Sequence, residues 1–407
     1  MPLSRRGLIA AAGSLAVPAR ARAQPAAQLR IGVLTDLFGQ YRDNSGPTSV
    51  LAARQAVEDF RPEQHGMAVE IIAADHQQKP DVGAGIAREW FDRDGVSAIA
   101  DVNNTAIALA VRTQAVEKDR ALLVSGAASA DLTGKYCSPN MVHWAPDTWG
   151  DAHSTGEALL RAGRRTFFLV VADYIFGHTL EREVTSLVQA GGGTVLGTVR
   201  YPFPGTTDFS AFLVHAQSSG ADVVAFCNPG GDMENAVKQA HEFGLSQGGR
   251  AVAPMFGFLT EMKAVGLETG QGLFMTETFY WDLNDRTRAF TRRFLPKSPG
   301  NYPCSLHAGC YIAVLHYLKA VAEGGEAPRA SGRAAIAAMK AMPTDDDCFG
   351  AASIRADGRF LCDTHLFQVK TPDESKGPWD IYRLVSSTPG ARAFRPLAEG
   401  GCTMAPI

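Results

Sequence analysis

Residues 165–172 read RTFFLVVA, an apolar run broken only at its first two positions. A strand buried on one face alternates apolar and polar residues, whereas a nearly continuous apolar run is typical of a parallel strand buried on both faces. A helix is predicted next, at about 178–190, and a second strand at 194–199. Strands joined by helices of this length form parallel β–α–β units with right-handed crossovers. The stretch therefore predicts an α/β fold.

The alternation of strands and helices extends along the chain in both directions. Towards the C-terminus, strands are predicted at 222–227 and 251–255, with helices at 207–218 and 232–243. Towards the N-terminus, strands are predicted at 29–34, 69–73, 96–100 and 121–124, with helices at 48–60, 80–93 and 105–118. The sequence thus predicts two doubly wound, Rossmann-like lobes, each with helices on both faces of a parallel sheet.

The chain is expected to pass between these lobes more than once. Crossings are predicted at 141–146, at 273–280 and at a hairpin around 350–370, with helices at 286–295, 305–322 and 331–341 in between. The predicted domains are lobe 1 at 24–145 plus 276–355, and lobe 2 at 146–275 plus 356–407. A multi-strand hinge would join them. Residues 371–407 carry few strong patterns.

Length, composition and charge exclude several classes of protein. The 407 residues are 45% hydrophobic and 20% charged, which excludes a disordered, collagen-like or coiled-coil chain. The formal net charge of -3 supplies no basic stripe, so no nucleic-acid partner is predicted. No stretch approaches 18 uncharged apolar residues, so no membrane-spanning helix is predicted.

The first 23 residues have the pattern of an export signal. Arg5 and Arg6 precede a short apolar run, residues 8–17, and the small-residue motif Ala21-Arg22-Ala23 follows. This order is typical of a signal peptide, and the arginine pair resembles a twin-arginine signal. We therefore expect cleavage near Ala23, a mature chain beginning near Gln24 and a location in the periplasm.

Seven cysteines would then lie in an oxidising compartment, where disulfides persist. Cys348 and Cys362 flank a predicted hairpin turn at 356–358 and are the predicted disulfide pair. The odd number leaves at least one thiol free or paired between chains. Cys304, His307 and Cys310 lie three residues apart near a helix start, but no second ligand cluster accompanies them, so no metal site is predicted.

The motifs that mark many enzymes of this fold class are absent from the sequence. There is no phosphate loop of the form GxxxxGK[ST], no GxSxG nucleophile turn and no HExxH zinc helix. The first strand is followed by Leu37-Phe38-Gly39-Gln40 rather than by a GxGxxG dinucleotide turn. No catalytic residue, no cofactor and no enzymatic activity are predicted.

Candidate binding residues follow the predicted strands, because open α/β sheets bind ligands at the carboxyl ends of their strands. The candidates are Tyr41, Asn103, Asn104, Thr105, Ser125, Ala127, Ala128, Ser129, Tyr174, Phe176, Asn228, Asp232, Phe258 and Tyr280. Free N–H groups at helix starts attract a carboxylate, and hydroxyl groups can add donors. Aromatic faces can enclose a planar or apolar ligand.

Simpler structural roles compete with binding at several of these positions. Thr105 and Asp232 also suit helix N-caps, and Phe176 and Phe258 also suit the core. Trp281 follows the candidate Tyr280, and a purely structural role that covers the strand of the second crossing is an alternative for it.

Four segments, in their order and spacing, resemble the type I periplasmic binding proteins, and among these the branched-chain amino-acid binding (leucine-binding-like) family of ABC importers. The segments are 29–34 (LRIGVL) with 39–41 (GQY), 125–133 (SGAASADLT), 176–177 (FG) and 228–236 (NPGGDMENA). The resemblance covers nearly all of the chain after residue 23. It implies the type I periplasmic-binding-protein fold, in which two lobes close on a small solute.

The resemblance also implies roles for individual residues. Tyr41 and Phe176 match aromatic residues that line the family's pocket. Residues 103–105 and 127–128 match the two segments that hold the ligand carboxylate. Asp232 falls where the amino-acid binders use an acid to pair with the ligand ammonium group.

Two departures from the family pattern argue against an α-amino acid as the ligand. Ala128 stands where the amino-acid binders have Thr, and Asp232 is shorter than the usual Glu. Backbone N–H groups or Ser129 could replace the missing hydroxyl group. The aromatic candidates leave room for an aromatic or other organic acid, or an amide.

The main hypothesis is a monomeric, exported substrate-binding protein that delivers a small solute to ABC permease subunits in the inner membrane. Residues 103–105 and 125–129 would bind first, and hinge closure would bring Tyr174 and residues 228–232 onto the ligand. Two alternatives stay open: a ligand-sensing module for a signalling partner, and an exported enzyme of unknown chemistry. A cytoplasmic regulator of this fold is disfavoured by residues 1–23.

Overall fold

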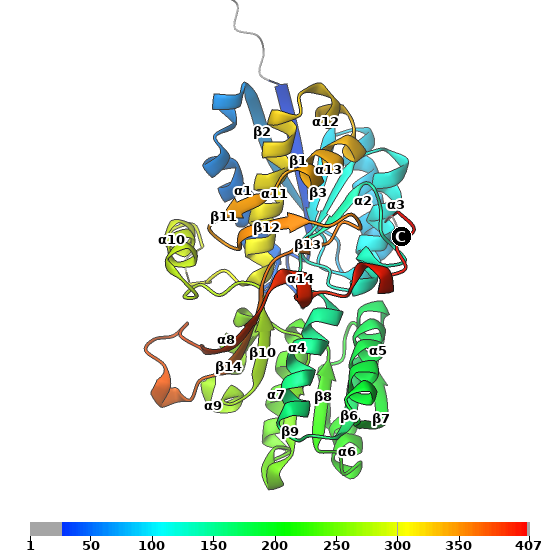
Figure 1. The fold of residues 1–407 in the computed structure, drawn as a ribbon, viewed down its shortest axis with the longest axis vertical. Helices are drawn as coiled ribbons and strands as arrows, with labels where there is room; N and C mark the ends of the chain where they lie inside the picture. Colours follow the sequence, from blue (N-terminus) through cyan, green and yellow to red (C-terminus); the bar gives the residue numbers. More distant parts are fainter. Residues whose placement is uncertain (1–26, 299, 405–407) are drawn as a thin grey trace, which may run out of the picture.

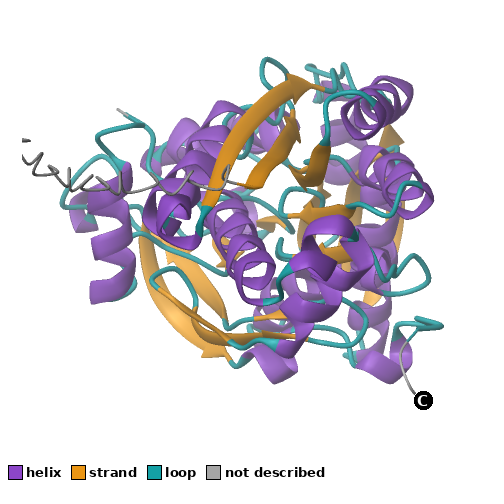
Figure 2. Ribbon diagram, turned by 90° about the horizontal axis from the view of Figure 1, so that it is seen from above, coloured by secondary structure: helices purple, strands orange, loops and turns teal. Residues whose placement is uncertain are grey.

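The computed structural model describes residues 27–298 and 300–404 (Figure 1). The predicted export signal at 1–23 lies outside the described residues. Within the described ranges, no helix is both long and apolar enough to cross a membrane. Helices lie on both sides of the strands when the molecule is seen from above (Figure 2).

The first lobe is built on a five-stranded parallel sheet in the order β2-β1-β3-β4-β5. Its strands are β1 (Ala27–Thr35), β2 (Met67–Asp75), β3 (Val96–Asp101), β4 (Ala121–Val124) and β5 (Met141–His143). Its connecting helices are α1 (Gly46–Phe60), α2 (Pro80–Asp92) and α3 (Thr105–Glu117). The predicted crossing at 141–146 therefore begins as a fifth strand of this sheet.

The second lobe is built on a four-stranded parallel sheet in the order β7-β6-β8-β9. Its strands are β6 (Thr166–Ala172), β7 (Thr194–Tyr201), β8 (Val223–Cys227) and β9 (Ala251–Pro254). Its helices are α4 (Thr148–Arg161), α5 (Ile175–Ala190), α6 (Ser210–Ser218), α7 (Gly230–Glu242), α8 (Leu259–Val265) and α9 (Leu267–Gly270). The apolar run at 165–172 forms β6, which is buried from Phe167 to Ala172, as predicted.

An antiparallel sheet accompanies the passage of the chain between the lobes. It contains β10 (Phe274–Glu277), β14 (Thr364–Val369) and β15 (Tyr382–Thr388), in the order β10-β14-β15. Figure 1 shows the chain passing between the lobes after β5, after β10 and before β14. The predicted crossing at 273–280 thus contributes a strand to a separate sheet.

The segment between the second and third passes covers the first lobe. It contains α10 (Asp285–Phe294), α11 (Ser305–Glu323), α12 (Glu326–Ala330) and α13 (Gly332–Ala341). It ends in the small antiparallel sheet of β11 (Thr344–Asp346), β12 (Gly350–Ile354) and β13 (Phe360–Leu361). Helix α11 is buried along most of its length, because it packs on α1 and on one face of the first sheet. Helices α2 and α3 pack on the other face.

The predicted disulfide between Cys348 and Cys362 is wrong. Cys137 is bonded to Cys402, and Cys348 and Cys362 are buried free thiols. The register explains the error, because Ser353 faces Leu361 across β12 and β13, and Cys348 lies in the turn between β11 and β12. Both thiols pack instead in the apolar core of the first lobe.

Candidate functional site

A small cavity lies where the carboxyl ends of both parallel sheets meet. It is lined by Tyr41, Asn44, Asn103, Thr105, Gly126, Ala127, Ala128, Tyr174, Phe176, Pro229, Phe256, Phe258 and Leu306. These residues follow β1, β3 and β4 in the first lobe and β6, β8 and β9 in the second, apart from Leu306 in α11. The cavity volume is about 20 Å³, which is room for little more than one water molecule, so an organic solute enters only when the lobes separate or side chains move.

The structure brings eight of the sequence candidates together in this lining: Tyr41, Asn103, Thr105, Ala127, Ala128, Tyr174, Phe176 and Phe258. The lining also contains residues that were not candidates. Gly126, Pro229 and Phe256 lie in the same strand-end loops as candidates, and Asn44 lies in the loop that follows β1. Only Leu306, among the described lining residues, follows no strand end.

The hydroxyl group of Thr105 is the clearest unused donor in the cavity. Oγ1 of Thr105 is buried and has no hydrogen-bond partner among the described residues. Helix α3 begins at Thr105, and the cap is the neighbouring Asn104, whose side chain accepts hydrogen bonds from the N–H groups of Ala106 and Ile107. Thr105 is therefore free to bind a ligand at the helix start, whereas Asn104 has a structural role.

Asp101 holds the first-lobe loops of the cavity in place. Its carboxylate accepts hydrogen bonds from Ser45 Oγ at 2.6 Å and from Ser125 Oγ at 3.5 Å, and its backbone oxygen accepts from the N–H groups of Ser125 and Gly126. Burial raises the pKa of Asp101 to about 6, against the lowering effect of the hydrogen bond from Ser45. Asp101 has a φ of 75° and Val102 a φ of 54°, a left-handed conformation that costs energy and clusters at functional sites. Ser125 therefore supports the cavity rather than lining it.

Aromatic rings form the second-lobe wall. Tyr174 stacks on Phe203 with ring centroids 4.3 Å apart, and Tyr41 of the first lobe stacks on the same ring at 5.8 Å. The Tyr41 and Tyr174 hydroxyl groups are hydrogen-bonded to each other at 2.8 Å. Phe256 contacts Phe176 and Phe258 edge to face, each with centroids 5.0 Å apart. Stacked and edge-on rings of this kind suit a planar or apolar ligand body.

Two predicted polar residues lie outside the lining of the cavity. Asp232 accepts a hydrogen bond from the Tyr201 hydroxyl group at 2.8 Å, and burial raises the pKa of Asp232 to about 7. Asp232 does not cap α7, because the N-cap position is Pro229. The buried amide group of Asn228 has no partner on either its oxygen or its nitrogen among the described residues. Unpartnered buried polar groups carry a free-energy cost, so a movement that exposed them to a ligand would relieve it.

Glu261 in α8 connects the two lobes and had no counterpart among the sequence candidates. Its carboxylate accepts hydrogen bonds from Asn44 Nδ2 of the first lobe at 2.8 Å, and from the N–H groups of Gly230 and Phe258 at 2.5 Å. Burial raises the pKa of Glu261 to about 8. The carboxyl group thus fixes two strand-end loops of the second lobe beside the cavity.

The last two candidates lie away from the cavity. Ser129 Oγ accepts a hydrogen bond from the Asp131 N–H and donates to Thr179 Oγ1 of α5 at 3.1 Å, so it joins the lobes. The Tyr280 hydroxyl group donates to the Trp379 backbone oxygen at 3.2 Å, and the Trp281 indole donates to the same oxygen. Tyr280 and Trp281 therefore belong to the hinge region.

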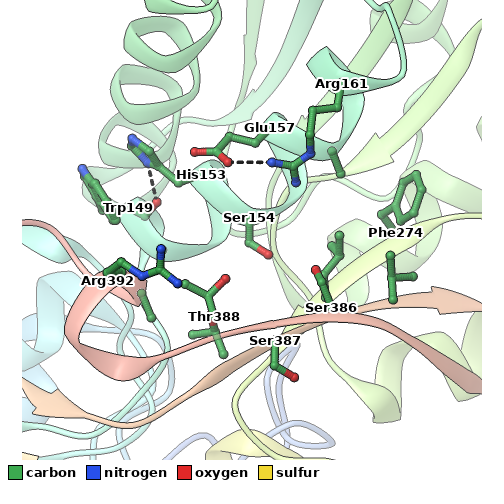
Figure 3. A pocket seen from close by; sticks show the side chains of 16 residues that line it. Trp149, His153, Ser154, Glu157, Arg161, Phe274, Ser386, Ser387, Thr388 and Arg392 are labelled. Atoms are coloured by element: carbon green, nitrogen blue, oxygen red, sulfur yellow. Dashed lines mark hydrogen bonds and ion pairs between the residues drawn. The ribbon is translucent and has the colours of Figure 1, made fainter.

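A larger hollow of about 520 Å³ lies between α4 and β15, away from the strand ends (Figure 3). Two pairs of groups in its lining are already engaged with each other. Arg161 forms an ion pair with Glu157, and His153 is hydrogen-bonded to the Trp149 backbone oxygen. The strand-end cavity, with its unused Thr105 hydroxyl group, is therefore the better candidate for a binding site.

Comparisons with known proteins agree with this geometry. The model of a family described as periplasmic binding protein matches residues 28–378. No curated protein matches the chain. A periplasmic binding protein from Burkholderia mallei is 39% identical, with a TM-score of 0.89 over 93% of this chain and 99% of that one. A branched chain amino acid ABC transporter periplasmic ligand-binding protein from Burkholderia xenovorans LB400 is 37% identical, with a TM-score of 0.82 over 93% and 100%.

A more distant solved structure shares the fold alone. It is a solute binding protein of an ABC transporter from R. palustris in complex with benzoate, 19% identical, with a TM-score of 0.80 over 92% of this chain and 99% of that one. These matches confirm the predicted type I periplasmic-binding-protein fold. Since the family model covers most of the chain and two relatives exceed 35% identity over nearly all of it, the chain belongs to the periplasmic binding protein family.

Proposed function

We propose that the chain is the periplasmic substrate-binding component of an ABC importer and captures a small organic solute between its two lobes. The observation that carries this proposal is the cavity where both sheets end. It combines an aromatic wall with the Thr105 hydroxyl group, which has no partner in the described part of the chain. A binding protein needs this combination of orienting donors and apolar surface, and it needs no catalytic group.

The solute class that fits the lining best is a small carboxylate with an apolar or aromatic body. The Thr105 hydroxyl group offers a neutral donor to a carboxylate at the start of α3, where Asn104 already accepts from the N–H groups of Ala106 and Ile107. No Arg or Lys is among the described residues that line the cavity, so this neutral donor would orient the anion. Ala127 and Ala128 leave space beside this donor, and the rings of Tyr41, Tyr174 and Phe176 would enclose the ligand body.

Closure of the lobes is the proposed mechanism of capture. The solute would bind first to the first-lobe segment at 103–105 and to the loop at 126–128. Hinge motion would then bring Tyr174 and Phe176 onto it and exclude water. The hydrogen bond between the Tyr41 and Tyr174 hydroxyl groups spans the site, so an entering ligand would replace or insert into it.

The remaining expectations about location and partners are part of the same proposal. The chain would be exported by a signal cleaved near Ala23, act as a monomer in the periplasm and meet ABC permease subunits at the inner membrane. We further propose that the end of the chain belongs with lobe 1, rather than with lobe 2 as the 356–407 boundary implies. Phe394 lies in the core of the first lobe, and Cys402 is bonded to Cys137.

A melting-temperature screen tests the proposal. The panel contains leucine and other amino acids, benzoate, 4-hydroxybenzoate, short aliphatic acids and the corresponding amides. A solute at 100 times its dissociation constant stabilises the folded protein by about 2.7 kcal/mol, which is readily measured. Calorimetry then gives the affinity, and recovery of the solute unchanged separates binding from turnover. If no member of the panel shifts the melting temperature, the proposed function is contradicted.

A further inference from the structure

A cluster of charged side chains joins the two lobes at one side of the cavity. Asp131 lies in the 3₁₀ turn Ala130–Thr133 of the first lobe, and Arg182 and Glu183 lie on α5 of the second. The Arg182 guanidinium donates to both Asp131 oxygens, at 2.7 and 3.2 Å, and to Glu183 at 2.6 Å. The Asp131 and Glu183 side chains are only 7% and 9% exposed. The cluster therefore places two nearly buried carboxylates, one from each lobe, around a single guanidinium group.

Besides Lys135, whose Nζ lies 3.1 Å from Asp131, a second arginine adds positive charge beside both carboxylates. Arg395 Nη1 lies 3.6 Å from Asp131 and 3.8 Å from Glu183, and the Arg395 side chain is 13% exposed. Burial alone would raise the pKa of Asp131, but Arg182 and Lys135 lower it below its ordinary value. Asp131 is therefore charged when the lobes are together. Without Arg395, the two carboxylates would repel each other across the lobes with less compensation, and buried like charges are costly.

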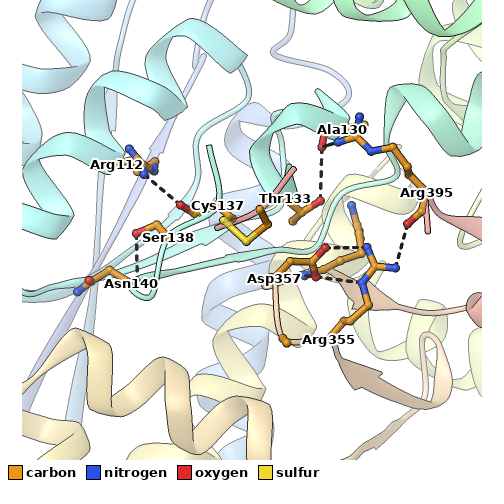
Figure 4. The surroundings of a disulfide bond; sticks show 12 residues. Arg112, Ala130, Thr133, Cys137, Ser138, Asn140, Arg355, Asp357 and Arg395 are labelled. Carbon is orange, nitrogen blue, oxygen red and sulfur yellow. Dashed lines mark hydrogen bonds and ion pairs between the residues drawn. A yellow bond between two sulfur atoms is a disulfide. The ribbon is translucent and has the colours of Figure 1, made fainter. Parts of the chain in front are cut away.

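Arg395 follows Phe394, which is buried in the first-lobe core, and it lies near the disulfide in space (Figure 4). The Arg395 side chain donates to the Ala130 backbone oxygen, and Arg355 donates to the Arg395 backbone oxygen at 2.9 Å. Beyond Arg395, residues 396–404 are half-buried or exposed, and the covalent tie is the disulfide from Cys402 to Cys137.

Gly134 shows how closely this segment lies on the first lobe. A Cβ atom at Gly134 would lie 2.4 Å from Arg395 Nη2 and 2.5 Å from the Gly400 backbone oxygen. Glycine therefore leaves the space that this close contact needs. Near the disulfide, Gly134 thus packs directly against Arg395 and Gly400 of the C-terminal segment.

We propose that the Cys137–Cys402 disulfide promotes ligand capture, because it tethers the C-terminal segment and so positions Arg395 between Asp131 and Glu183, where it stabilises the closed arrangement of the lobes. Arg182 and Arg395 are positioning residues in this scheme, since neither lines the cavity. Where it concerns affinity, the inference rests on the proposed function. Where it concerns lobe closure, it does not.

The affinity test compares three variants with the wild type. They are Arg395→Gln, Cys137→Ser with Cys402→Ser, and the three changes together. Using the tightest binder among leucine, benzoate and 4-hydroxybenzoate, we expect both the arginine and the double-cysteine variants to bind about fivefold more weakly, through faster dissociation. The combined variant should bind no more weakly than Arg395→Gln alone, because both changes remove the same contact.

A ligand-independent measurement keeps the inference separate from the proposed function. Spin labels at Val116→Cys on α3 and Val214→Cys on α6, two exposed positions in different lobes, report the distance between the lobes. We expect longer distances to be more populated in the Arg395→Gln and double-cysteine variants than in the wild type. A lower melting temperature with unchanged distances and affinity would mean that the disulfide only stabilises the fold, and would overturn the inference. Failure of every solute to bind, with the distance change intact, would count against the proposed function alone.

Discussion

The hydroxyl group of Thr105 is the smallest feature on which the binding proposal depends. Thr105→Val keeps the shape of the side chain and removes the donor. We expect carboxylate binding to weaken about tenfold, since a hydrogen bond to a charged group contributes about 1.5 kcal/mol or more. Titration calorimetry measures the change.

Thr113→Val is the matched control for this substitution. Thr113 lies on the same helix, is exposed and donates its hydroxyl group to the Leu109 backbone oxygen. Its replacement should leave the affinity within twofold of the wild type, a shift of roughly 0.4 kcal/mol. Equal affinity in Thr105→Val and the wild type would remove Thr105 from the site.

Glu261 gives the protein a predictable pH dependence of stability. Burial raises the pKa of Glu261 to about 8, so between its usual value and pH 8 the folded state keeps a proton that the unfolded chain has released. Unfolding then releases a proton, and the free energy of unfolding falls as the pH rises through this window, by at most about 1.4 kcal/mol per pH unit. Glu261→Gln should reduce that slope in urea unfolding between pH 5.5 and 8.

Glu268→Gln, at an exposed position of α9, is the control and should keep the wild-type slope. Glu277 has its pKa raised to about 8 by burial as well, so part of the slope should remain in Glu261→Gln. A Glu261→Gln slope equal to that of the wild type would contradict the assignment of this proton.

Some individual cavity residues could be predicted from the sequence, and others could not. Tyr41, Thr105 and Tyr174 follow strands whose apolar patterns are plain, so their place at the sheet edge could be inferred. Leu306 reaches the cavity only because α11 packs across the first sheet after the second crossing, and no local pattern reports such a contact. Glu261 lies behind the lining, where its role depends on loops brought together by two different strands.

Among the elements, α4 was not predicted from the sequence. It contains Gly150 and Gly156, which lower helix propensity. The structure explains the second glycine, since a Cβ atom at Gly156 would lie 2.4 Å from the Leu187 side chain of α5. Close packing between two helices, rather than local preference, therefore decides this element. The β14–β15 pairing was missed for a similar reason, because residues of β15 are mostly exposed and show no clean alternation.

The first crossing depends on Arg359, whose side chain is fully buried. It donates to the backbone oxygens of Ala145 and Phe360, lies 3.4 Å from Asp147, and its guanidinium carbon lies 4.3 Å from the Phe394 ring centroid. Arg359→Met would leave Asp147 buried without this partner. We expect the free energy of unfolding in urea to fall by about 3–5 kcal/mol.

Arg288→Met provides the comparison for this prediction. Arg288 forms ion pairs with Asp282 and Asp285 on the surface, with 37% of its side chain exposed. Its loss should cost about 1 kcal/mol or less. Similar losses for the two variants would mean that the Arg359 contacts do not hold the crossing together.

For the whole molecule, the two-lobe plan followed from the periodicity of strands and helices. The proposed assignment of the chain end to the first lobe rests instead on a disulfide, one buried aromatic ring and a few hydrogen bonds, which no local sequence pattern reports. The cysteine pairing could not be derived either, since Cys137 and Cys402 are separated by 265 residues. Contacts over such distances depend on the completed fold.

A fragment that contains only the first sheet tests whether that sheet folds without the helices that the chain adds after its second passage between the lobes. Residues 27–143 include β1 to β5 but not α11 or α13, which cover one face of that sheet. We expect this fragment to lack a cooperative thermal transition in circular dichroism, whereas residues 27–404 show one. A sharp, reversible transition in the fragment would contradict this view of the core.

Helix α11 comes late in the sequence, so the first sheet is synthesised well before the helix that covers it. The first sheet leaves the ribosome long before the helix that covers it, since synthesis must proceed from His143 to Ser305. At about 5–20 residues per second, this interval lasts roughly ten seconds or more. During that time the apolar side chains of β1, β3 and β4 lack their partner helix. A nascent chain of this design would expose apolar surface through roughly two fifths of translation, and chaperones that bind nascent chains would find their target on the side of the sheet that faces α11.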